Sequence, residues 1–145
     1  MILYLDSSAL VKRYVAERGS ADVARLLAQA DMMGTSIISR AEISAALSKA
    51  ARAKLLSRRE AAAALQVFRA EWADWIRLQL TETIVAQADA LAWEHSLRGY
   101  DAVHLASALF WQDTVGEHLT LATFDHELWE SAQRNNLKPF PEKLA

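Results

Sequence analysis

The sequence is poor in the residues that cross-link, interrupt or anchor a chain. It holds no cysteine, which excludes a disulfide framework and any metal site built on thiolates. Only two prolines and four glycines occur, and no repeat or low-complexity tract indicates a linker. The apolar run at 2–5 has no basic segment before it, and no stretch approaches the ~18 apolar residues of a membrane span. We therefore expect a soluble, unprocessed, cytoplasmic chain with no membrane contact.

A strong excess of charge is also missing. The formal net charge at pH 7 is -2, whereas proteins that bind nucleic acids are usually basic. Divalent cations held by a few acidic residues would nevertheless leave the rest of the chain weakly positive and make such a site electropositive. A polyanionic substrate therefore stays compatible with the composition.

The chain does contain a regular alternation of short apolar runs and longer amphipathic stretches. Its 145 residues, 52% of them hydrophobic, suit one domain spanning 1–145. The run at 2–5 is apolar throughout, as expected of a central parallel strand buried on both faces. Further strands are expected at 35–38, 75–80 and 119–122, with an edge strand or an extension in the proline-containing tail. This pattern predicts a three-layer α/β domain.

Capping signals place several helices between these strands. The segments 39–42 and 57–60 both have the Ser-x-x-Glu spacing of a capping box, so each should open a helix of an αα-hairpin. A long helix is expected over 81–96, with Arg98-Gly99 as its stop. The next helix should begin at Tyr100 or Asp101.

Four acids stand where strands end or helices begin. They are Asp6 after the first strand, Glu42 in the first helical turn after the second, Asp101 at a helix start and Asp125 after the fourth strand. Ligands of open α/β sheets bind beyond the carboxyl ends of the strands, so these four acids should converge there. Several carboxylates so close together need a counter-ion, and hard oxygen ligands favour Mg²⁺, with Mn²⁺ as the alternative ion.

Such metals do the chemistry that phosphodiester cleavage requires. One lowers the pKa of a water, and another stabilises the leaving oxygen of an in-line displacement. The hydroxyls of Ser7 and Thr123 lie beside acidic positions and could orient a carboxylate from behind. Three further residues, Arg13, Arg40 and His104, are candidates for contacting substrate, against the alternative of solvated or structural side chains.

Each acid also has a plainer interpretation. Glu42 could simply complete a capping box, and Asp101 could simply be an N-cap, without any role in a site. Asp6 and Asp125 are harder to explain in this way, because a carboxylate that ends an apolar strand is costly to desolvate without a partner. The physical case for a shared site therefore rests most on Asp6 and Asp125.

Order and spacing of four motifs resemble the PIN-domain family, in particular the VapC toxins of bacterial and archaeal toxin-antitoxin pairs. The motifs are Tyr4-Leu-Asp-Ser-Ser-Ala-Leu-Val-Lys12, Ser39-Arg-Ala-Glu42, Gly99-Tyr-Asp-Ala-Val-His-Leu-Ala-Ser-Ala108 and Leu121-Ala-Thr-Phe-Asp125. The resemblance spans nearly the whole chain, and the family's acidic positions map onto all four acids.

The resemblance implies a three-layer α/β/α PIN-like fold with a central, mainly parallel sheet of four or five strands. It implies an intact Mg²⁺-dependent endoribonuclease, the toxin of a type II toxin-antitoxin system, which hydrolyses RNA with metal-activated water. It further implies a homodimer held inactive by an antitoxin in an apolar groove. One or two of the five tryptophans would then face a partner.

Two competing hypotheses stay open at this point. One is phosphoryl transfer through Asp6 in a receiver-like or phosphatase-like fold, although Ser8 stands where such a phosphatase usually has a second Asp. The other is a non-catalytic interaction module whose acids only cap helices, and it predicts no effect of Mg²⁺ on the melting temperature. The identity of the RNA is not visible in the sequence.

Overall fold

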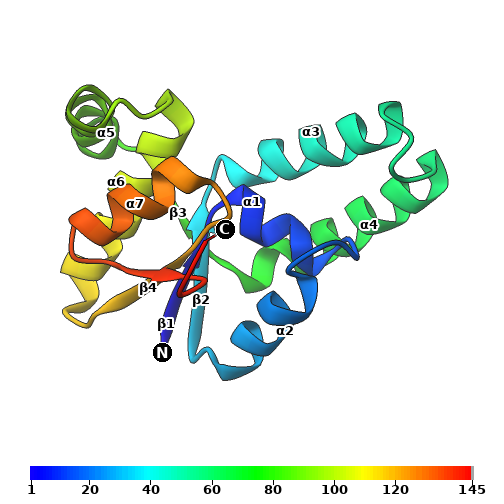
Figure 1. Cartoon of the computed structure of the whole chain (residues 1–145), viewed down its shortest axis with the longest axis horizontal. Coiled ribbons are helices and arrows are strands. Elements are labelled where there is room, and N and C mark those ends of the chain that lie inside the picture. Colours follow the sequence, from blue (N-terminus) through cyan, green and yellow to red (C-terminus); the bar gives the residue numbers. More distant parts are fainter. Residues whose placement is uncertain (145) are drawn as a thin grey trace.

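The computed structural model describes residues 1–144. In chain order, the elements are β1 (Ile2–Leu5), α1 (Ser7–Leu10), η1 (Val11–Arg13), α2 (Ser20–Gln29), β2 (Met32–Ser36), α3 (Ser39–Arg52), α4 (Arg58–Glu71), η2 (Trp72–Asp74), β3 (Ile76–Leu78), α5 (Glu82–His95), α6 (Gly99–Val115), β4 (Leu119–Ala122), α7 (His126–Arg134) and β5 (Lys138–Phe140). The five strands form one parallel sheet in the order β3-β2-β1-β4-β5, with helices on both faces (Figure 1). The three-layer α/β prediction is confirmed, and the tail supplies the edge strand β5.

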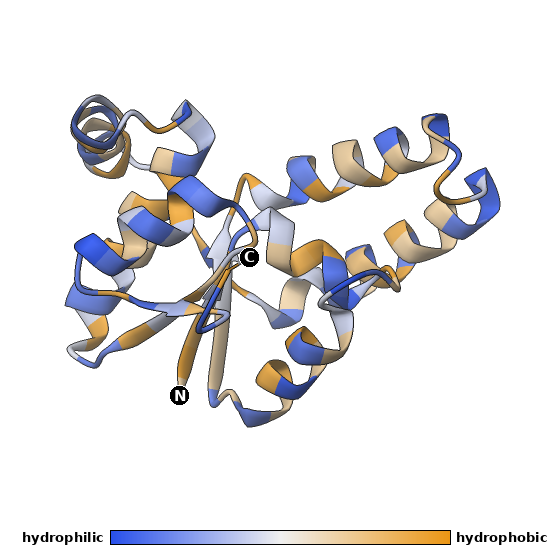
Figure 2. Ribbon diagram, in the orientation of Figure 1, coloured by the Kyte–Doolittle hydropathy of each residue, from blue (hydrophilic) through white to orange (hydrophobic). Residues whose placement is uncertain are grey.

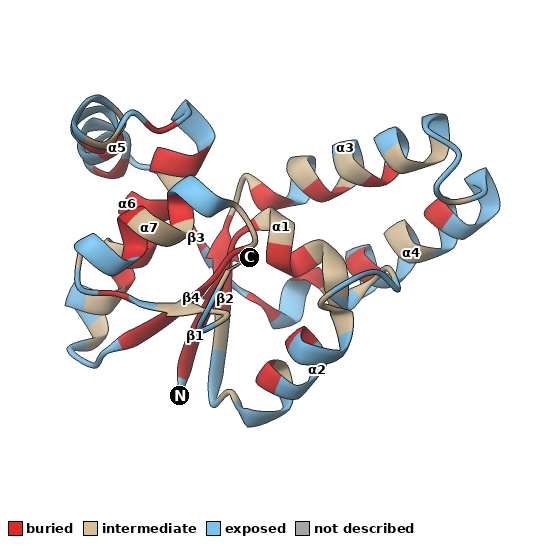
Figure 3. Ribbon diagram, in the orientation of Figure 1, coloured by how far each residue is buried: buried red, intermediate tan, exposed pale blue. Residues whose placement is uncertain are grey.

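The central strand β1 is buried on both faces (Figure 3), as its unbroken apolar sequence predicts. Ile2 and Tyr4 pack with α5, α6 and α7, whereas Leu3 and Leu5 pack with α1 to α4. Alternation of side chains along the strand thus divides the core into two halves. Hydrophobic and hydrophilic residues alternate along the helices (Figure 2), as expected of amphipathic helices that bury one side.

Helices α3 and α4 form the expected hairpin and extend away from the sheet (Figure 1). Ser57 and Glu60 make both bonds of the predicted capping box at the start of α4. Between the helices lies a cavity of about 270 Å³, lined by Arg58 and by small or apolar side chains that include Leu47, Ala51 and Leu65. We call this cavity the hairpin groove.

The second strand lies earlier in the chain than predicted. β2 ends at Ser36, and Ile38 already precedes α3 as its N-cap residue. The prediction followed the β-branched residues at 35–38, but the strand instead includes Gly34, where the Trp111 ring of α6 leaves no room for a Cβ. Tertiary packing has overridden local propensity here.

The boundary between α5 and α6 also differs from expectation. Ser96, in the left-handed region with φ of 53°, ends α5. Arg98 is the N-cap residue of α6 and Gly99 is its first residue, so these two residues start a helix and do not stop one. Over residues 1–144, no helix combines the length and the apolarity needed to cross a membrane.

Candidate active site

The carboxyl ends of β1 and β4 lie side by side at the centre of the sheet, with Leu5 paired to Ala122. Asp6 follows β1 and caps α1, accepting a hydrogen bond from Ala9 N at 3.0 Å. Asp125 follows β4 and caps α7 in the same way, accepting from Leu128 N at 2.9 Å. Two of the four acids are therefore fixed where a strand turns into a helix.

The capping roles considered for Glu42 and Asp101 are wrong. α3 has no side-chain cap, because the Ser39 hydroxyl contacts the Thr35 hydroxyl at 2.6 Å instead. Asp101 lies in the first turn of α6, behind the N-cap residue Arg98. Neither carboxylate caps a helix: that of Asp101 accepts from Arg98 and that of Glu42 lies against His104.

Asp6 is enclosed by hydrogen-bond donors. Its Oδ2 accepts from the Thr123 hydroxyl at 2.6 Å, and its Oδ1 accepts from the Ser8 hydroxyl at 2.7 Å in addition to the bond from Ala9 N. Only 2% of Asp6 is exposed. Burial raises the pKa of Asp6 above its ordinary value, against the opposing effects of His104 and the Thr123 hydroxyl.

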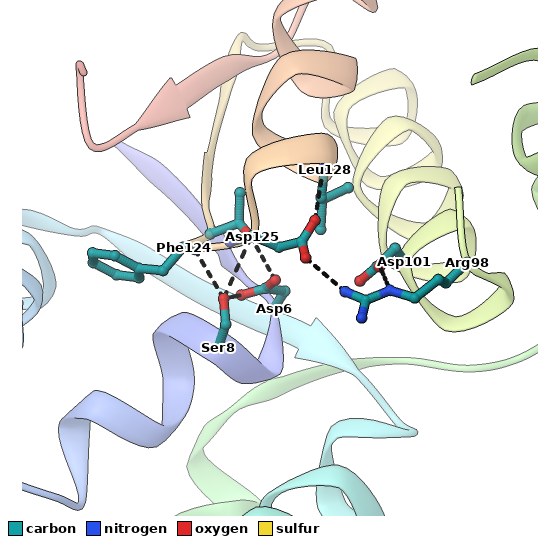
Figure 4. A network of polar contacts seen from close by, with 8 residues as sticks. Asp6, Ser8, Arg98, Asp101, Phe124, Asp125 and Leu128 are labelled. Atoms are coloured by element: carbon teal, nitrogen blue, oxygen red, sulfur yellow. Dashed lines mark hydrogen bonds and ion pairs between the residues drawn. The ribbon is translucent and has the colours of Figure 1, made fainter. Parts of the chain in front are cut away.

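Ser8, and not the predicted Ser7, supplies the hydroxyl beside Asp6. The Ser8 hydroxyl donates to Asp6 and accepts from Phe124 N at 2.8 Å, which connects the start of α1 to the segment after β4 (Figure 4). The residue two positions after a helix cap can turn back toward the capping carboxylate, a local signal that the sequence interpretation missed.

Arg98 connects the other two aspartates (Figure 4). Its Nε donates to Asp101 Oδ2 at 2.9 Å, and its Nη2 donates to Asp125 Oδ2 at 2.6 Å. Asp101 is almost fully buried, and this burial raises its pKa; the hydrogen bond from Arg98 opposes the shift, and the charge of Asp125 adds to it. These two ion pairs were not predicted from the sequence, where Arg98 was interpreted as part of a helix stop.

Glu42 is held by a buried histidine. Glu42 Oε1 lies 2.7 Å from His104 Nε2, and His104 Nδ1 lies 2.7 Å from the Tyr4 hydroxyl. A carboxylate can only accept, so Nε2 carries the proton, and in the neutral ring Nδ1 accepts from Tyr4. Both ring nitrogens of His104 are thus engaged inside the protein, and only 1% of the residue is exposed. This burial disfavours the predicted contact of His104 with substrate.

Electrostatic effects connect the four acids in pairs. After burial and the bond from Arg98, the charges of Asp125 and Asp6 both raise the pKa of Asp101. Burial, and then the charges of Asp6 and Glu42, raise the pKa of Tyr4. Within residues 1–144, no three His, Cys, Asp or Glu side chains are already grouped as ligands of a single ion. The carboxylates are oriented instead toward Arg98, His104 and the two hydroxyls.

The two arginines predicted to contact substrate lie differently. Arg13 Nη2 donates to Glu71 at 3.1 Å, at the end of α4, and so is engaged away from the four acids. Arg40 lies exposed in the first turn of α3, two residues before Glu42. A role of either residue in substrate binding stays a prediction.

The donor set fits a hard divalent cation. It consists of the oxygens of four carboxylates, and burial raises the pKa of two of these carboxylates, Asp6 and Asp101. Hydroxyls and an imidazole form hydrogen bonds to the carboxylates. Neutralising such buried charges requires protons or cations. Asp6, Glu42, Asp101 and Asp125 are the residues that could hold an ion.

Comparison with known proteins gives a consistent result. A sequence model of the family described as "PIN domain" matches residues 3–133. The chain is 37% identical over 144 residues to Ribonuclease VapC45 of Mycobacterium tuberculosis (strain CDC 1551 / Oshkosh), an alignment that covers 99% of this chain and 97% of the relative.

Two solved structures share the fold. FitAcB from Neisseria gonorrhoeae superposes with a TM-score of 0.64 at 19% identity, covering 97% of this chain and 98% of that one. A toxin-antitoxin complex from Klebsiella pneumoniae superposes with a TM-score of 0.62 at 20% identity, covering 86% and 87%. At such low identity these two likenesses concern the fold alone.

Proposed function

The chain belongs to the PIN-domain family, and from that premise we propose that it is a Mg²⁺-dependent endoribonuclease, the toxin of a type II toxin-antitoxin pair. Mn²⁺ is the expected substitute ion. The full-length relative named a ribonuclease supports the choice of RNA as substrate.

The observation that supports this proposal is the linkage of acids from separate elements near the ends of β1 and β4: Arg98 joins Asp101 to Asp125, and the charge of Asp6 acts on Asp101. Burial raises the pKa of two of them, so the ionised cluster is stable only with added positive charge. Helix capping does not account for Glu42 and Asp101, because neither residue forms a cap.

Divalent ions bound by these acids would supply an activated water and stabilise the leaving oxygen of an in-line displacement. The chain itself keeps the carboxylates in place: Thr123 and Ser8 hold Asp6, and His104 holds Glu42. The side chain of Asp125 is 24% exposed, so an RNA phosphate could approach the cluster from that side.

Replacement of single acids tests the site. Asp6→Asn and Asp101→Asn should lower the Mg²⁺-dependent cleavage of an RNA oligonucleotide by more than about a hundredfold. Each substitution replaces an anionic ligand with a neutral amide of nearly the same shape. Asp22→Asn, on the exposed face of α2, is the matched control and should cleave normally. Undiminished cleavage by either site variant would contradict the assignment.

Phosphoryl transfer through Asp6 is less well supported. Both carboxylate oxygens of Asp6 accept hydrogen bonds inside the protein, and the residue is buried. A nucleophilic carboxylate needs an oxygen that can reach the phosphorus atom. We therefore retain direct hydrolysis as the proposed reaction.

The proposed partner is an antitoxin whose apolar segment occupies the hairpin groove. Apart from Arg58, small or apolar side chains line this groove, as a docked amphipathic segment requires. Leu65→Glu should abolish co-purification with the antitoxin, whereas Val67→Glu on the exposed side of α4 should not. Equal retention of the antitoxin by both variants would contradict this placement.

The proposed homodimer can be measured separately by light scattering. Trp93 on α5 is 90% exposed and is the tryptophan most available for a partner, whereas Trp72, Trp75 and Trp111 are buried in the core. A monomer at all concentrations would refute the dimer.

A further inference from the structure

Arg98 is the countercharge of two of the four acids in this structure. Among Lys and Arg side chains of residues 1–144, it alone forms an ion pair with any of the four acids. It pairs with two of them at once, Asp101 on its own helix and Asp125 at the start of α7. The two ends of the guanidinium therefore join two separate elements.

The contacts use the same oxygens that an ion would need. Oδ2 of Asp101 and Oδ2 of Asp125 both point at the guanidinium, whereas Oδ1 of Asp125 already accepts the cap bond from Leu128 N. Two cations that share these oxygens would repel each other at short range. Binding of a divalent ion through Asp125 Oδ2 and Asp101 Oδ2 would therefore displace Arg98 at least in part.

Displacement is feasible because the arginine is only lightly anchored. Its side chain is 57% exposed, and apart from the two carboxylates it contacts the Tyr100 ring, with the guanidinium carbon 4.9 Å from the ring centre. Its backbone is fixed as the N-cap residue of α6, so the displaced guanidinium would stay at the rim of the site. A planar guanidinium is well suited to bind a phosphate through two parallel hydrogen bonds.

We propose that Arg98 has two alternating roles: it is the countercharge of Asp101 and Asp125, and when a divalent ion takes over that role it binds a phosphate of the RNA substrate. This inference rests on the proposed function and adds a substrate-binding residue to it. The two roles predict opposite effects of one substitution, since loss of Arg98 should strengthen ion binding and weaken RNA binding.

The test compares Arg98→Gln, Arg98→Lys and the control Arg25→Gln. Arg25 also pairs with an aspartate three residues away, Asp22, but on the exposed face of α2. Titration calorimetry with Mn²⁺ in the absence of RNA should show about three- to tenfold tighter binding for Arg98→Gln, because two partly exposed ion pairs no longer compete. The KM for an RNA oligonucleotide should rise about tenfold or more at saturating Mn²⁺.

Arg98→Lys keeps the charge but cannot span both carboxylates, so its Mn²⁺ affinity and its KM should lie between those of the wild type and Arg98→Gln. Arg25→Gln should match the wild type in both measurements. Unchanged or weaker Mn²⁺ binding by Arg98→Gln, or an unchanged KM, would overturn the two-role assignment while leaving the proposed ribonuclease intact. Failure of the proposed function would give a different result. The wild type would then show no Mn²⁺ binding that depends on Asp101, so that Asp101→Asn would not change its titration.

Discussion

At the residue scale, the chain from Tyr4 through His104 to Glu42 is the most constrained part of the site. All three side chains come from different elements, and the two hydrogen bonds between them are both 2.7 Å long. The carboxylate fixes the position of the imidazole proton, and the Tyr4 hydroxyl occupies the other ring nitrogen. Glu42 is thereby held through Oε1.

Substitution of His104 should separate this positioning role from simple packing. His104→Leu removes the donor to Glu42 and should weaken Mn²⁺ binding and RNA cleavage by about 10- to 100-fold. His104→Gln keeps an N–H donor and should recover most of both, measured by calorimetry and by cleavage assay. His118→Leu, on the exposed surface, is the control. A Leu variant with wild-type Mn²⁺ affinity would show that His104 only fills space.

The candidate site residues were easier to predict than the side chains that contact them. The positions of Asp6 and Asp125 already predicted a shared site, because carboxylates after apolar strands are expensive to bury alone. The prediction of Glu42 and Asp101 depended more on the family motif. The partners were not predictable in the same way. Arg98 and Tyr4 reach the site through contacts of residues far apart in sequence, which local periodicity does not encode.

At the element scale, the closest contact between the sheet and α6 occurs at Gly34. A Cβ at this position would lie 2.7 Å from the Trp111 ring and 3.2 Å from the Ile76 carbonyl oxygen. Trp111 is itself buried, so its ring has little freedom to move away. This contact sets the distance between β2 and the helix that carries both Asp101 and His104.

Gly34→Ala should therefore destabilise the fold by about 1–3 kcal/mol through overpacking. Gly99→Ala is the matched control, because nothing lies within 4 Å of its Cβ position at the start of α6. That change should be neutral or should stabilise the protein by up to about 1 kcal/mol, since alanine favours the helix. Urea unfolding gives both values, and equal stability of the two variants would contradict the packing argument.

Helix starts show what local sequence could and could not predict. The Ser57 capping box and the Thr81 cap follow from neighbouring residues alone and are confirmed. The caps of α1 and α7 were missed, because Asp6 and Asp125 were interpreted only as site residues. Each of these two aspartates uses one oxygen for its helix and the other for the site. An interpretation that gives each residue a single role does not predict this.

At the scale of the whole molecule, the buried acids connect stability to pH. Burial is the main cause that raises the pKa of both Asp6 and Asp101. A carboxyl whose pKa is higher in the folded than in the unfolded chain binds more protons when folded. Its stabilising contribution is complete below the unfolded pKa near 4 and is lost as the pH rises through the raised folded value.

In EDTA, the contribution of these two carboxyls to the free energy of unfolding should therefore fall between about pH 4 and their raised pKa values. Saturating Mg²⁺ should restore the melting temperature at neutral pH, because the bound ion replaces the missing protons. Asp101→Asn should flatten the EDTA profile and reduce the effect of Mg²⁺, as measured by thermal unfolding across the pH range. A wild-type melting temperature indifferent to Mg²⁺ would favour the non-catalytic interaction module.

The double use of Asp6 and Asp125 as helix caps has a consequence for how this protein can lose its activity. Asparagine caps a helix about as well as aspartate does, so exchange of either residue for asparagine removes a negative charge while the start of α1 or α7 keeps its bond. A copy silenced in this way would keep its shape and its surfaces. Such a copy would act as a decoy, competing with active copies for every partner that recognises the surface and not the chemistry.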